Sequence, residues 1–147
     1  MKRTLLWGLL WGLVPPMTAE ANPAAEVVIA AIDIRLTPEI VVESGITVTL
    51  AQDLALDPET TPYVRARAVS ALAALGGEEA RRVIEVVAVM DPNRMVRAQA
   101  YVSLARAFGP WDRPGISGFL MEGLAGDEAA VTRRIRAELQ RLAQGPR

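Results

Sequence analysis

The chain has 147 residues, of which 51% are hydrophobic but only 5% aromatic, so its core must consist mainly of aliphatic side chains. Cysteine and histidine are absent, which excludes disulfides, thiolate nucleophiles, imidazole bases and zinc sites with Cys or His ligands. Most familiar catalytic arrangements are therefore excluded, and we expect no cofactor, no metal and no enzymatic activity. With a formal net charge of −1, we also expect no nucleic-acid partner.

The N-terminus resembles a secretory signal peptide. Lys2 and Arg3 form a short basic region, and residues 4–14 form an apolar run that is too short to span a bilayer comfortably. The small-x-small pattern at 19–21 then predicts cleavage between Ala21 and Asn22. We therefore expect an exported protein, periplasmic or secreted, which stays attached to a membrane only if the signal is not cleaved.

Residues 22–44 allow two interpretations. Apolar and charged residues alternate over 32–36, as in a strand. One face of a helix is also possible, and it would carry Val28, Ala31, Ile32 and Arg35. Pro38 breaks either element. We expect a capping segment with a helix over 24–36, because the first repeat of a helical array needs cover for its exposed face. A strand hairpin over 27–49 is the alternative.

Three copies of one apolar pattern follow, each with the spacing i, i+4, i+8, i+11. This spacing places four apolar side chains on one stripe of an α-helix. The copies begin 32 and 35 residues apart, the separation expected when each unit is a pair of short helices that packs on its neighbour. The copies are Val64, Ala68, Leu72 and Leu75, then Val96, Ala100, Leu104 and Ala107, and finally Val131, Ile135, Leu139 and Leu142.

A shorter apolar helix precedes each stripe. We expect these first helices at residues 45–56, 78–90 and 115–126. The second helices, which carry the stripes, are expected at residues 61–75, 93–108 and 128–143. Because the turns within each pair are short, neighbouring helices must be antiparallel. The sequence therefore predicts an all-α fold, a short right-handed α-solenoid of about three antiparallel helix pairs over 45–147, preceded by a signal peptide over 1–21.

Two of the repeated segments share a more specific pattern. Residues 57–75 and 91–108 both contain Asp-Pro, then Val-Arg, then small residues and a leucine. This pattern resembles the short HEAT-like repeats of the phycobilisome lyase type. A third copy over 127–142 has Thr132 where the others have arginine, which is typical of a terminal repeat. The resemblance implies a helical repeat fold, and it constrains function only weakly.

The resemblance also implies a hydrogen-bonded ladder between successive repeats. An aspartate just before a helix can cap free backbone amides, and arginine has enough donors to bridge two turns. We therefore interpret the ladder residues as structural. In this ladder Asp57 and Asp91 accept hydrogen bonds from Arg65 and Arg97, and Asp127 with Arg133 forms a weaker copy.

Four further residues are candidates for contact with a partner. Arg134, Arg136 and Arg141 belong to the densest charge group and flank the third stripe, so we expect them to be exposed. They form either a solvated cap or a site for an anionic partner or lipid headgroups. Trp111 lies in a loop stiffened by two prolines, where it either anchors a partner or folds back over the last helix pair.

These features predict a non-enzymatic protein–protein interaction or scaffolding module that acts outside the cytoplasm. The alternative is an accessory subunit of a lyase or other enzyme complex, which the resemblance permits although no side chain supports it. Three helix pairs are near the minimum for a stable array. We therefore expect a protein partner, and self-association into a homo-oligomer remains open.

Overall fold

The computed structural model describes residues 22–145, so the expected signal peptide over 1–21 lies outside the described residues. This part of the chain contains eight α-helices and no strand. The all-α prediction is therefore confirmed, and the alternative hairpin over 27–49 is wrong. No helix between residues 22 and 145 is both long and apolar enough to cross a membrane.

The N-terminal segment forms two short helices instead of the expected helix over 24–36. The first, α1 (Pro23–Ala30), ends before Ala31, and α2 (Pro38–Glu43) begins after the Thr37 side chain, which caps it. Arg67 holds the non-helical stretch between them, because its guanidinium donates to the backbone carbonyls of Ile29, at 3.0 Å, and Ile34. Both short helices pack against α4, the helix that carries Arg67.

Six longer helices follow at the positions that the apolar patterns predict. Their N-termini are capped mainly by side chains, since Thr47, Thr61, Asn93 and Asp112 each accept a hydrogen bond from a backbone amide of the first turn. Their bounds differ from the expected ones by only a few residues. The helices are α3 (Val48–Leu56), α4 (Pro62–Leu75), α5 (Gly77–Met90), α6 (Arg94–Ala107), α7 (Arg113–Gly126) and α8 (Ala129–Gln144).

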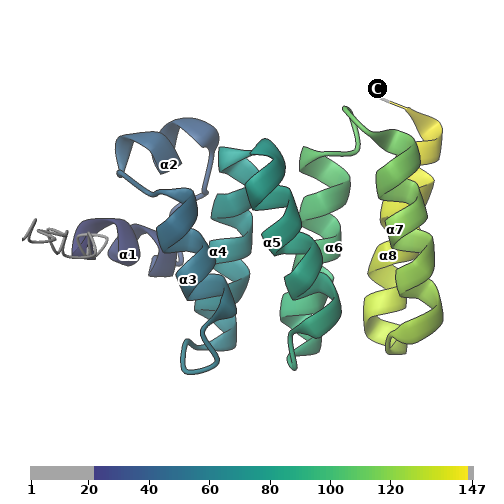
Figure 1. The fold of residues 1–147 in the computed structure, drawn as a ribbon, viewed down its shortest axis with the longest axis horizontal. Coiled ribbons are helices and arrows are strands. Elements are labelled where there is room, and N and C mark those ends of the chain that lie inside the picture. The colour runs from purple at the N-terminus through teal and green to yellow at the C-terminus, as the bar shows by residue number, and fades with distance from the viewer. Residues whose placement is uncertain (1–21, 146–147) are drawn as a thin grey trace, which may run out of the picture.

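The longer helices are antiparallel to their neighbours in sequence and stand side by side in a row, with α7 in front of α8 in Figure 1. Helix α4 contacts α6, and α6 contacts α8, so the second helices of the three pairs form one layer. Helices α3, α5 and α7 pack on this layer, each against its own partner. The side of α4, α6 and α8 that points away from the core is called the second-helix face below.

The three apolar stripes supply much of the core. Most of their central residues are fully buried, as are residues of α5 and α7 that face them, such as Ile84 and Leu120. Leu139 in the third stripe is partly buried against this cluster, as are the stripe ends Val64 and Leu75. The repeated spacing therefore marks the packed side of each second helix, as predicted.

Helix α7 approaches α6 through an aromatic contact and a glycine. The rings of Tyr101 and Phe119 lie with their centroids 5.8 Å apart. Gly123 faces the same tyrosine so closely that an added Cβ would lie 2.6 Å from the hydroxyl oxygen and 2.7 Å from the ring carbon that bears it. The close approach of the two helices therefore requires a residue without a side chain at this position.

Gly123→Ala is expected to lower the free energy of unfolding by about 1 to 3 kcal/mol, because the methyl group must displace the tyrosine ring or the whole of α7. Chemical denaturation followed by circular dichroism measures this loss. Gly118→Ala is the matched control, since no atom lies within 4 Å of a Cβ built there. Alanine favours the helix at that position, so equal losses in the two variants would contradict the close approach.

Candidate functional site

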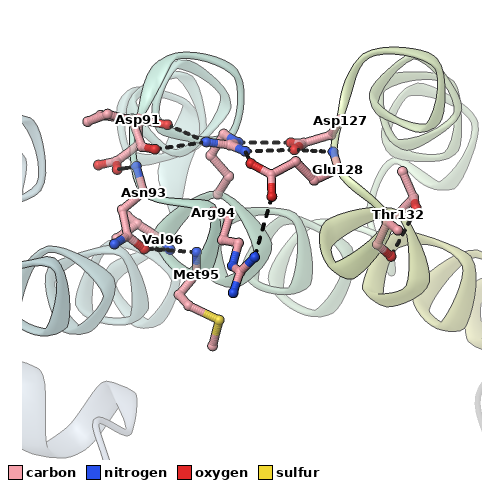
Figure 2. Close-up of polar contacts among 11 residues, drawn as sticks. Asp91, Asn93, Arg94, Met95, Val96, Asp127, Glu128 and Thr132 are labelled. Carbon is pink, nitrogen blue, oxygen red and sulfur yellow. Dashed lines mark hydrogen bonds and ion pairs between the residues drawn. The ribbon is translucent and has the colours of Figure 1, made fainter.

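Two arginine–aspartate pairs, one buried and one partly buried, connect the helix pairs to one another. In the first, Arg65 of α4 donates from Nε to Asp91 Oδ2 at 2.8 Å and from Nη2 to Asp91 Oδ1 at 3.1 Å. In the second, Arg97 of α6 makes the same two-pronged contact with Asp127 at 2.9 and 2.8 Å (Figure 2). Each arginine thus binds the aspartate in the turn of the following pair, with the bidentate geometry that gives strong hydrogen bonds.

The same groups also fix the turns on both sides. Arg97 donates to the backbone carbonyls of Asp91 at 2.9 Å and Pro92 at 3.2 Å, which belong to its own turn. Asp91 accepts a hydrogen bond from the Asn93 amide at 2.7 Å, as Figure 2 shows. The first two turns are therefore each held by their own aspartate and by the arginine that follows it.

The ladder differs from the expected one at every rung, and the carboxylate of Asp91 accepts from Arg65 and not from Arg97. Asp57 accepts hydrogen bonds from the Glu59 amide and the Thr60 hydroxyl, and it makes none with Arg65, because each arginine reaches forward to the next turn. Asp127 pairs with Arg97 and not with Arg133. Arg133 is exposed, since Thr132 takes the buried position and donates its hydroxyl to the carbonyl of Ala129 at 3.2 Å.

The Arg97–Asp127 contact predicts a loss of stability in acid. Hydrogen bonds from Arg97 hold the pKa of Asp127 below its ordinary value of 3.8, so the pair stabilises the fold above that pH. This contribution disappears as the pH falls through the lowered pKa. We expect the free energy of unfolding to fall below about pH 4, and to fall less steeply in Asp127→Asn. Urea unfolding at several pH values tests this, and equal slopes for the two proteins would contradict the pairing.

The four candidate partner-contact residues differ in how exposed they are and in whether they bond to the rest of the protein. Trp111 is 88% exposed in the loop between α6 and α7, so the alternative in which it folds back over the last helix pair is wrong. Arg134 and Arg136 are exposed on α8. Arg141 is tied to the protein, because it donates to Glu138 and, at 2.8 Å, to the backbone carbonyl of Ala105. Its role is to hold α8 against α6.

The second-helix face carries two hollows. One has a volume of about 430 Å³ and lies between α4 and α6, next to the segment that leads into α2. The other has a volume of about 270 Å³ and lies between α6 and α8. Met95, Gln99, Val102 and Arg106 of α6 follow the spacing i, i+4, i+7, i+11 and therefore share one side of that helix. The two hollows thus belong to one surface.

All charged residues that line these two hollows are arginines. The hollow between α4 and α6 is lined by Arg35, Arg67 and Arg106, and the one between α6 and α8 by Arg94, Arg133 and Arg134. Hollows on the opposite side are different, since one contains the compensated Arg65–Asp91 pair and another is lined by Glu122 and Asp127. Arg94 and Arg106 are paired with Glu128 and Glu138, which lie outside the lining of the hollows. The charge inside both hollows is nevertheless positive.

Comparison with known protein families, with curated proteins and with solved structures finds no match for this chain. The HEAT-like resemblance therefore rests on the residues of this chain alone. What the chain does must be argued from its own surfaces.

Most of the arginines on this face were not expected from the sequence. Arg133 was expected in the ladder and Arg134 at a partner site, and the remaining four were not singled out: Arg35, Arg67, Arg94 and Arg106. A usable signal existed on α4 and α6, where arginine recurs beside small residues such as Ser70 and Ala74. Arg35 gave no such signal, because only the fold brings its segment against α4.

Proposed function

We propose that this protein is a short HEAT-like α-solenoid that acts as a non-enzymatic protein-interaction module, with the second-helix face as its binding surface. The observation that carries the proposal is the side-by-side packing of α4, α6 and α8, which leaves one shared surface with two hollows. Surfaces built from stacked helix pairs are extended and suit a polypeptide partner.

The bonding between the pairs supports the repeat interpretation. Arg65 and Arg97 occupy equivalent positions in α4 and α6, and each bonds to the turn of the next pair. The same local unit is thus used twice in succession. Thr132 and the exposed arginines of α8 suit the proposal that the array ends there, because a terminal repeat needs a polar outer surface.

The proposed location outside the cytoplasm rests on the expected signal peptide. Cleavage before Asn22 would leave intact the cap that this residue forms on α1, where its side chain accepts from the Ala25 amide at 3.2 Å. Mass spectrometry of the exported protein tests the proposal. A mature N-terminus at Asn22 supports it, whereas recovery of intact Met1 in a membrane fraction points to an uncleaved anchor.

Site-specific photo-crosslinking tests the binding surface. A photoreactive phenylalanine analogue replaces Met95 or Arg106, which lie on the second-helix face of α6. The matched controls carry the same analogue on the other side of the molecule, at Met121 on α7 or at Arg82 on α5. Met95 and Met121 are 63% and 58% exposed, so the paired positions are equally open to a partner. We expect the same discrete adduct from both α6 positions and none from the controls.

A different distribution of adducts would overturn the proposal. If an adduct forms at Met121 or Arg82 but not on α6, the partner binds the opposite side. If no position gives an adduct in cells that make the protein at its native level, the chain is not an interaction module of this kind.

A further inference from the structure

The second-helix face carries positive charge that the protein itself does not compensate. Within residues 22–145, Arg35, Arg133 and Arg134 make no ion pair, although all three are exposed and line the hollows. Among the residues that the structure describes, no carboxylate lines either hollow. This local excess occurs in a chain whose formal net charge is −1, so it is a property of one surface and not of the whole molecule.

The same surface offers a hydrogen-bonding group between the charges. The side-chain amide of Gln99 donates from Nε2 to the hydroxyls of Ser70 at 3.1 Å and Ser103 at 3.2 Å. These bonds fix the amide, and its Oε1 makes no hydrogen bond among the described residues. Since no buried side-chain oxygen between residues 22 and 145 lacks a partner, this acceptor is open to the exterior. It can accept from the backbone amide of a bound chain.

We propose that the two hollows bind an extended acidic segment of a partner protein, a proposal that rests on the function proposed above. Helices pack about 10 Å apart, so a path across α4, α6 and α8 is about 20 Å long, the reach of about six extended residues. Carboxylates on such a segment pair with the arginines of each hollow, and small residues such as Ala74 and Ala98 let its backbone come close. The two acidic positions lie about three residues apart.

The lining favours a polypeptide over other polyanions. Proteins that hold single-stranded nucleic acid stack its bases on aromatic side chains. No aromatic residue in the described part of the chain lines either hollow. A membrane surface is held by large apolar side chains that insert below the headgroups. Met95 is the single exposed large apolar residue among those that line the two hollows.

Selection from a displayed library of random octapeptides on the purified protein, expressed from the full chain, tests the proposal. We expect enrichment of peptides with two or more Asp or Glu residues about three positions apart. A fluorescent peptide from this pool should bind at least about tenfold more weakly to Arg35→Gln/Arg134→Gln, because each lost arginine removes a charged hydrogen bond. Arg82→Gln/Arg136→Gln removes two exposed arginines that do not line the hollows and should bind within about twofold of the parent.

The remaining outcomes show whether the acidic segment alone is refuted or the proposed interaction module as well. Equal losses in the two double variants, or enrichment of neutral or basic peptides, overturn the acidic segment. The same follows if single-stranded DNA or phosphatidylglycerol vesicles bind more tightly than the peptide and with the same dependence on Arg35 and Arg134. No enrichment, combined with an adduct at Met95, overturns this proposal alone, whereas no enrichment and no adduct overturn both.

Discussion

Arg65→Ala is expected to lower the free energy of unfolding by about 3 to 5 kcal/mol, because it leaves a buried aspartate without its partner. The side chains of Arg65 and Asp91 are only 6% and 4% exposed. Arg65 also donates to the carbonyl of Thr60, so the substitution removes bonds to two turns at once. Urea unfolding followed by circular dichroism at neutral pH measures the loss.

Two variants make this prediction specific. Arg82→Ala breaks an ion pair with Glu78 that is exposed to solvent, and it should change stability by less than about 0.5 kcal/mol. Replacing both Arg65 and Asp91 by apolar residues of similar size should restore much of the loss, since no unpaired charge then remains buried. If Arg65→Ala costs no more than Arg82→Ala, the buried pair does not join the first two repeats.

Leu104→Ala is expected to lower the free energy of unfolding by about 3 to 5 kcal/mol, through lost burial and the cavity that remains. Leu104 is fully buried on α6, and α6 contacts α4, α5, α7 and α8, so the surrounding side chains cannot easily collapse into the space. We expect a single unfolding transition with a lower midpoint, because this residue belongs to the core shared by the helix pairs.

Met95→Ala on the same helix is the matched control. Met95 is 63% exposed, so its truncation should change stability by less than about 0.5 kcal/mol. If Leu104→Ala unfolds in two separate transitions, and only the transition of the second helix pair moves to a lower midpoint, the helix pairs unfold independently.

The helix pairs could be predicted from the sequence because each second helix buries one continuous stripe. Four apolar residues at helical spacing, followed by a break such as Gly76 or Gly109, fix both the identity of a helix and its approximate ends. The breaks also set the antiparallel arrangement. The residues that the local pattern places on one side of each helix are also the ones that pack in the core. Residue spacing was therefore sufficient to predict the helices in this part of the chain.

The N-terminal segment could not be predicted in the same way. A helix over 24–36 is consistent with its apolar residues, but the backbone beyond Ala30 is held by the guanidinium of Arg67. That contact joins residues more than thirty positions apart, and no local propensity reports it. The short helix α2 begins where Pro38 predicts only a break, because Thr37 caps it.

The arginine ladder was predicted in composition but not in connection. Spacing alone cannot tell whether Arg97 bonds within its own turn or reaches the next, and the fold shows that its carboxylate partner is Asp127. The hollows of the second-helix face could not be predicted from the sequence at all. Their arginines extend from Arg35 to Arg134 and come together only when α4, α6 and α8 pack side by side.

Backbone and side-chain amide NMR of the labelled protein, titrated with the acidic octapeptide from the selection, maps the binding surface residue by residue. We expect the largest shifts on the second-helix face, at Ser70, Gln99 and Ser103, and no change at the amides of Arg82 and Met121. Shifts confined to α5 and α7 at saturating peptide would contradict the claim that the second-helix face is the binding surface.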